Sequence, residues 1–130
     1  MESIVLPVKL EDSLEGLAES VGLLSQTPHS LKIQFQTKDA ILGLIKSGVK
    51  VIEIPMKNVL EISIKKSIFS HKIIISVDDL NYVSQLPYTG NHEISLSVSR
   101  KNIDQAIDFV RSIRLDMSER VYNQAIKDAS

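Results

Sequence analysis

The three histidines have the widest chemical range of any side chains in this sequence. His29, His71 and His92 each fall in a predicted turn or at the start of a predicted strand. Histidine is a common metal ligand, but no two of these residues stand at the short spacing of a local ligand pair. We interpret them as turn residues in solvent and expect no metal ion and no cofactor. A metal site where the turns of different hairpins meet is the alternative.

Other groups that carry out catalysis are sparse. Asp78 and Asp79 are adjacent, and because neighbours on a strand point to opposite faces, the pair favours a turn over a shared proton. The chain has no cysteine, no Gly-x-Ser-x-Gly motif and no glycine-rich phosphate loop. We expect no catalytic residue and interpret the protein as a non-enzyme. A small barrel enzyme or metal-binding protein is a further alternative.

Size and composition fit one domain. The chain has 130 residues, of which 43% are hydrophobic and 24% charged, and a formal net charge of −1. We assign residues 1–130 to one domain, with a core at about 19–117, an N-terminal segment 1–18 and a C-terminal helical extension 118–130. The sequence shows no signal-peptide pattern and no apolar run of membrane-spanning length, so we expect a cytoplasmic protein.

Charge is uneven along the chain. Residues 31–75 hold eight lysines against three acidic residues, a net charge of +5. One interpretation of this basic segment is that its lysines lie in solvent on the outer face of a sheet. The other is that they form a patch that binds an anion. Aromatic residues are 5% of the chain and lie apart from one another, so we expect no nucleic-acid partner.

Most of the chain has the period-two alternation of half-buried strands. Ile94, Leu96 and Val98, for example, alternate with serines, and a strand at 59–65 would place Leu60 and Ile62 on one face. The predicted strands are 20–25, 31–36, 49–54, 59–65, 72–77 and 93–99, with a further short strand at 80–83.

After Ser99 the apolar spacing changes to three and four residues, which predicts a helix. Asn102 is the predicted N-cap, with Gln105 as its capping-box partner. The apolar stripe consists of Ile103, Ala106, Ile107, Val110, Ile113 and Met117. The expected fold is therefore mainly β with a C-terminal α-helix: a bent antiparallel barrel or sandwich of six or seven strands, capped by that helix.

The region from Leu31 to about Ile113 resembles the bacterial pleckstrin-homology-like domains, a group with few assigned activities. The resemblance is carried by 31–35, 42–47, 51–55, 59–69, 86–87 and 96–101, the last leading into the predicted helix. It implies a seven-stranded, strongly bent barrel capped by the C-terminal helix. We predict a non-catalytic binding or scaffolding role, through protein contact or self-association.

The segment between two predicted strands, residues 39–48, is unusually apolar for a loop. It holds Ile41, Leu42, Leu44 and Ile45, fringed by Lys38, Lys46 and Lys50. Apolar tips with basic flanks suit shallow insertion into an anionic bilayer, so peripheral membrane or anionic head-group binding is the first alternative. A lid folded back over the barrel is the other interpretation of the same residues.

The predicted helix is longer than one barrel end requires. From Asn102 to Ile126 it would reach roughly 37 Å at 1.5 Å per residue. The excess carries Met117, Val121, Tyr122 and Ile126. These residues are the predicted interface, either with a second copy of the chain or with another protein. The alternatives are that this end of the helix covers the N-terminal segment Ile4 to Leu10, or that it frays in solution.

Overall fold

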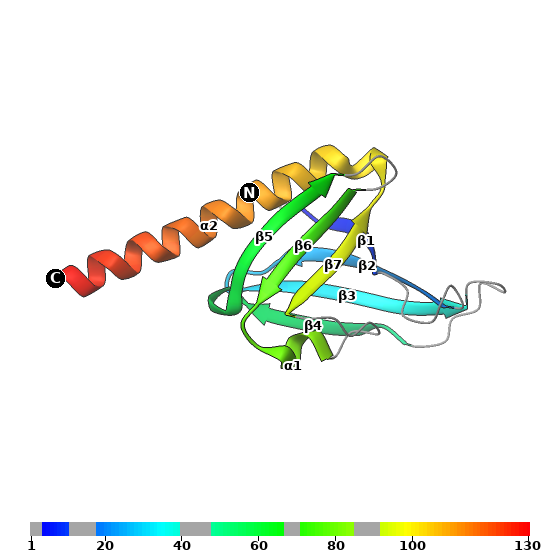
Figure 1. Ribbon diagram of the computed structural model, residues 1–130, viewed down its shortest axis with the longest axis horizontal. Helices are drawn as coiled ribbons and strands as arrows, with labels where there is room; N and C mark the ends of the chain where they lie inside the picture. The colour runs from blue at the N-terminus through cyan, green and yellow to red at the C-terminus, as the bar shows by residue number, and fades with distance from the viewer. Residues whose placement is uncertain (1–3, 11–17, 40–47, 67–70, 85–91) are drawn as a thin grey trace.

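The computed structural model describes residues 4–10, 18–39, 48–66, 71–84 and 92–130 (Figure 1). It contains strands and helices in an order of strands first and a long helix last. The elements are β1 (Leu6–Leu10), β2 (Ala18–Gln26), β3 (Ser30–Asp39), β4 (Lys50–Pro55), η1 (Met56–Asn58), β5 (Val59–Lys66), β6 (His71–Val77), α1 (Leu80–Ser84), β7 (Glu93–Val98), η2 (Arg100–Asn102) and α2 (Ile103–Ala129).

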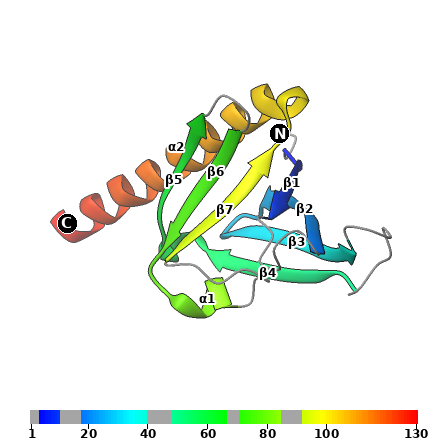
Figure 2. The same cartoon turned by 45° about the vertical axis from the view of Figure 1, so that its right-hand side comes forward.

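The strands form one seven-stranded antiparallel sheet in the order β4-β3-β2-β1-β7-β6-β5. Figures 1 and 2 show β5–β7 crossing over β2–β4, so that the sheet is bent and α2 runs along its β5 side. This confirms the predicted class, mainly β with a C-terminal α-helix. The sheet is not closed into a barrel, because β4 and β5 are its edges and do not pair with each other among the described residues.

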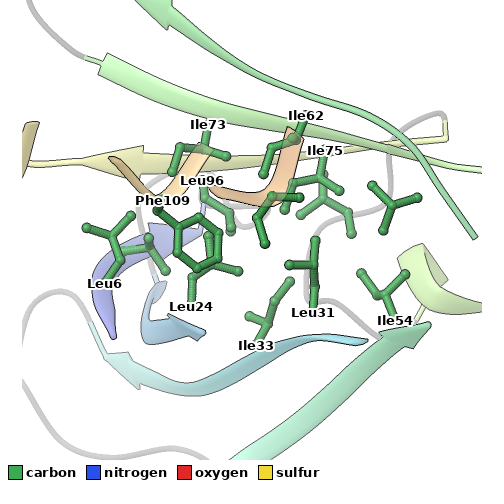
Figure 3. Close-up of a cluster of buried hydrophobic side chains, with 14 of the residues drawn as sticks. Leu6, Leu24, Leu31, Ile33, Ile54, Ile62, Ile73, Ile75, Leu96 and Phe109 are labelled. Atoms are coloured by element: carbon green, nitrogen blue, oxygen red, sulfur yellow. The ribbon is translucent and has the colours of Figure 1, made fainter. Parts of the chain in front are cut away.

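The core fills the space between the two halves of the sheet. Figure 3 shows Ile62, Ile73 and Leu96 from the β5–β7 half facing Leu24 and Ile33 from the other half. Each strand contributes alternate residues to this core, as the period-two pattern predicts. The burial of so much aliphatic surface is the main force that holds the bent sheet together.

Part of the N-terminal segment 1–18 joins the sheet. Leu6–Leu10 form β1, which lies between β2 and β7 and buries Leu6, Val8 and Leu10. The alternation is only five residues long and contains Pro7, which normally argues against a central strand. Pro7 is tolerated opposite Leu23 on the exposed face.

The predicted short strand at 80–83 is also wrong, because these residues belong to the helix α1. The backbone N–H of Asn81 donates a hydrogen bond to Asp79 Oδ1 at 2.9 Å, which satisfies a donor of the first turn. Val83 is the one buried residue among Leu80–Val83, the part of this helix whose burial is described, so its pattern carries too little periodicity to separate a helical turn from a strand.

The helix α2 packs its first half onto the sheet. The predicted stripe is correct for Ala106, Val110 and Ile113, which are buried, but it omitted Phe109, the largest fully buried side chain among the described residues. Asn102 is the N-cap residue without a side-chain capping bond, so the predicted capping box with Gln105 is wrong. Instead Asn102 Nδ2 donates to Ser99 Oγ at 3.2 Å.

Three polar contacts fix the middle of α2 against β2, β5 and the turn between β2 and β3. Arg114 Nε donates to the carbonyl oxygen of Ile62 at 2.9 Å. Gln26 Nε2 donates to Asp116 Oδ2 at 3.1 Å, and Arg120 Nη2 donates to the Pro28 carbonyl oxygen at 2.9 Å. The 27-residue helix is about 40 Å long at 1.5 Å per residue, and residues 118–130 are exposed. Its C-terminal end projects beyond the sheet (Figures 1 and 2).

Candidate functional site

A groove runs between the edge strand β5 and the helix α2, and we call it the β5–α2 groove. Its two halves share Arg114, whose bond to the Ile62 carbonyl oxygen ties the strand to the helix. The apolar half contains Leu60 and Ile62 from β5, and Met117, Val121, Tyr122 and Ala125 from α2, with Glu61 and Ser118 beside them. The cationic half contains Ser63, Ile64 and Lys66 from β5, and Ile107, Val110 and Arg111 from α2.

The apolar half is open to solvent. Leu60 is 59% exposed, Val121 is 71% exposed and Tyr122 is 66% exposed. Leu60 was predicted to share a face with Ile62, and this is wrong because the register shifts between Val59 and Glu61. The bulge turns Leu60 out of the core while Val59 and Ile62 stay buried. Large apolar side chains gathered in this way are typical of a contact surface.

The cationic half has three positive side chains and no carboxylate among its lining residues. Lys66 and Arg111 are exposed, and Arg114 stands at the junction with the apolar half. Arg111 Nη1 lies 3.5 Å from Asp108 Oδ1, but both side chains are more than half exposed, so this ion pair is weak. The cationic half therefore presents a positive potential to the groove.

Strand register places more positive charge beside this half. Lys65 faces Lys72 and Lys66 faces His71, at the end of the β5–β6 pair. Among the described residues, His71 Nδ1 is the one buried side-chain polar atom that lacks a hydrogen-bond partner. Because Lys65 and Lys66 point to opposite faces of β5, both faces of the sheet are basic at this end.

The other side of α2 is more polar. Met56, Lys57 and Val59 face Arg120, Gln124 and Lys127 there, and Met117 and Val121 reach this side as well. The Arg120 side chain forms an ion pair with Asp116 and donates a hydrogen bond to the Pro28 carbonyl oxygen. These contacts support the helix, and the larger apolar surface lies on the β5 side.

The structure brings the predicted interface residues to the projecting part of α2. Met117 is half-buried against the core, whereas Val121, Tyr122 and Ile126 are exposed. Met117, Val121 and Tyr122 line the β5–α2 groove. Ile126, 50% exposed, lies outside it and shares a side of the helix with Leu115 and Tyr122, because residues eleven and seven apart fall on nearly the same side.

The predicted membrane loop falls mainly outside the described residues. Ile41, Leu42, Leu44, Ile45 and Lys46 are among those that the structure does not describe. Lys38 belongs to β3, and Lys50 is exposed at the start of β4. The membrane interpretation of residues 39–48 therefore stays a prediction.

Sequence reasoning missed the β5 side of the groove and its cations. Lys66 belongs to β5 whereas Arg111 and Arg114 belong to α2, so no local spacing links the strand lysine to the two helix arginines. Across the described ranges, no three His, Asp or Glu residues come together in a way that could hold a metal ion. Within the same ranges, no helix combines the length and apolar character that crossing a membrane requires.

No family model matches this chain, and searches of curated proteins and of solved structures find no match either.

Proposed function

We propose that this protein is a non-catalytic binding module that contacts a segment of another protein in the β5–α2 groove. The observation that carries the proposal is the exposed apolar half of the groove, formed by Leu60, Val121 and Tyr122. Exposed apolar surface of this kind loses free energy when another protein covers it. Aromatic and aliphatic anchors at the centre of a patch supply most of the energy of such contacts.

The available area fits a small specific interface. Leu60, Val121 and Tyr122 of the groove are each more than half exposed, and Leu115 and Ile126, on the neighbouring side of α2 outside the groove, are at least half exposed. Together such side chains offer on the order of 500 Å² of apolar surface, so a partner that covers them gives roughly 1,000 Å² in total, near the lower limit for a specific contact.

Self-association is the other form of this function, and the projecting end of α2 is the surface that would mediate it. Residues 114–130 hold three basic and three acidic side chains, so two copies of this end would not repel each other strongly. The groove, however, is a concave surface beside a strand edge, and this shape favours a segment of a different protein.

We also propose that the chain is one of the pleckstrin-homology-like domains, since its strands-then-helix order agrees with the fold which that resemblance implies. The unpaired edges β4 and β5 depart from the closed barrel which that resemblance implies. This relationship is part of the proposal and does not decide the ligand, because one fold supports many functions.

Selection of random peptides on the immobilised protein tests the function. We expect selected peptides to bind the wild-type protein and to lose binding in Val121→Asp, which places a charge in the apolar half. Val49→Asp is the matched control, because Val49 is 65% exposed and lies ahead of β4, away from α2. Loss of binding in both variants, or in neither, would contradict the proposed site. Light scattering on the same samples reports self-association.

A further inference from the structure

We propose that two copies of this protein associate through the outer face of strands β1 to β4, which we call the β1–β4 outer face. Each copy lays this face on the same face of the other copy. The two sheets then pack as the layers of a sandwich, about 10 Å apart, around a two-fold axis. This surface is separate from the β5–α2 groove, because the residues that line the two do not overlap.

Strand register defines the residues of the β1–β4 outer face. Side chains alternate between the two faces of a sheet, and the core side is marked by buried residues such as Leu24 and Ile33. The residues between them therefore point outward and form rows across the four strands. One row is Pro7, Leu23, Gln34 and Val51, and the next is Lys9, Val21 and Gln36, continued by Val49 just before β4.

The composition of this face differs from that of the outer face of β5 to β7. Of the eight positions in the two rows, five are aliphatic or proline, two are glutamine and one is charged. The nine outer positions of β5 to β7 hold four charged residues, four serines and one isoleucine. They are Glu61, Ser63, Lys65, Lys72, Ile74, Ser76, Glu93, Ser95 and Ser97. The β5–β7 side has the polar character of a sheet face in water, whereas the β1–β4 outer face is depleted of charge like the centre of a protein interface.

The apolar side chains of the β1–β4 outer face are exposed. Val49 is 65% exposed, Val51 is 46% exposed and Leu23 is 39% exposed. Val5, which precedes β1 in the same alternation as Pro7, is 50% exposed. A hollow of about 370 Å³ lies in the same face, beside Leu23 and Val49, and can accept a side chain of a partner. Covering these side chains with another protein surface removes them from water and lowers the free energy.

The polar groups of the face favour a second copy as the partner. A face that meets itself brings like groups together, so charged side chains at its centre would repel their own copies. Gln34 and Gln36 are neutral, and each amide both donates and accepts hydrogen bonds, so it can pair with an amide of the other copy. Lys9 stands at the β1 end of its row, and in the row beyond, Lys32 and Glu53 face each other within one copy. The centre of the face is therefore compatible with itself.

The size of the face is sufficient for a specific dimer. Four strands about 4.8 Å apart, with about five residues of each at roughly 3.4 Å, cover an area of roughly 19 by 17 Å. The relief of the side chains raises the accessible surface of this area to on the order of 500 Å² for each copy. Two copies would then bury roughly 1,000 Å² in total, which reaches the lower limit for a specific interface.

Sedimentation velocity of the purified protein, from about 10 µM to about 1 mM, tests the inference. We expect the weight-average mass to rise with concentration from the 14.5 kDa of one chain toward twice that value. Val51→Asp should raise the dissociation constant of the dimer at least tenfold, because it places a charge from each copy in the covered apolar surface. Val121→Asp is the matched control, since it makes the same substitution at a site on α2 that is 71% exposed, and it should change the constant less than twofold. Circular dichroism checks that both variants are folded.

A pair of opposite charges tests whether the face meets itself. Gln34→Glu and Gln34→Lys each place like charges in the two copies, so each variant alone should dimerise at least threefold more weakly than wild type. An equimolar mixture of the two should associate more tightly than either alone, because opposite charges then meet, and 500 mM NaCl should reduce this gain. Ser95→Glu and Ser95→Lys are the matched control pair on the outer face of β7, and mixing them should give no gain.

The remaining outcomes overturn the inference and separate it from the proposed function. A protein that stays monomeric at about 1 mM does not associate through this face. A dimer that Val121→Asp dissociates and Val51→Asp leaves intact has its contact on α2. Binding of phosphatidylcholine vesicles by a monomer, lost in Val51→Asp, would replace the second copy by a lipid surface. A monomer that binds selected peptides in a Val121-dependent way upholds the groove while this inference fails, and a Val51-dependent dimer that binds no peptide gives the reverse result.

Discussion

Reversing one charge at each of two facing pairs should move stability in opposite directions. Lys65 faces Lys72, so Lys65→Glu turns a repulsive pair into an attractive one. Lys32 faces Glu53, so Lys32→Glu turns an attractive pair into a repulsive one. Both variants change the net charge of the protein from −1 to −3, so any effect of total charge is the same in the two.

The magnitude follows from the facing positions. A charged pair in such positions contributes about 0.2–1 kcal/mol to sheet stability, and changing its sign alters the free energy of unfolding by up to twice that amount. Because Lys65 is exposed and Lys32 is half-buried, water screens both pairs. We therefore expect Lys65→Glu to raise the free energy of unfolding by about 0.5–1 kcal/mol, and Lys32→Glu to lower it by a similar amount.

Urea denaturation followed by circular dichroism measures both changes, at 20 mM and at 500 mM NaCl. At the higher salt the screening length falls to about 4 Å, so both effects should shrink together. The slope of free energy against urea should stay the same, because neither variant changes the surface that unfolding exposes. Shifts in the same direction for the two variants, or shifts that ignore salt, would refute the account of the facing charges.

Three further perturbations test the fold and the groove. Phe109→Ala should lower the free energy of unfolding by about 3–5 kcal/mol in a urea titration, because it empties a fully buried site; a loss below 1 kcal/mol would contradict this packing. Gly22→Ala should cost about 1–3 kcal/mol or more, since its Cβ would lie 2.2 Å from the Gln34 carbonyl oxygen; an unchanged melting temperature would show that β2 and β3 are not so close. Val121→Asp should leave the free energy of unfolding within about 0.5 kcal/mol of wild type, because the side chain is 71% exposed, and a large loss would place Val121 in the core.

The sequence predicted most of the sheet, because its strands alternate clearly. The strands with serines or lysines on the outer face were located to within a few residues, and the long helix followed from its spacing of three and four. β1 was missed because five residues that include Pro7 give a weak signal. The orientation of Leu60 was missed because a bulge breaks the alternation that the prediction assumed.

The groove could be predicted only in part. The exposed residues of α2 were expected, since a helix of that length exceeds what the sheet covers. The β5 side was not, because strand order within a sheet is a property of the whole chain. Nothing near Leu60 or Lys66 in the sequence reveals that β5 is an edge or that Arg114 lies beside it. The closure of the barrel was predicted from the family resemblance, and the edges β4 and β5 do not pair.

The junction of β1 with β7 has a consequence for how the molecule is made. It is the seam between the two halves of the sheet, and it joins residue 9 to residue 97. The β2–β3 pair closes around a short turn at Thr27–Pro28, whereas this seam must close a loop of most of the chain and loses the corresponding entropy. During translation β1 therefore cannot pair with β7, its second neighbour in the sheet, until β7 has been synthesised. Folding of the complete sheet should be slow for a protein of this size, since distant pairings lower folding rates.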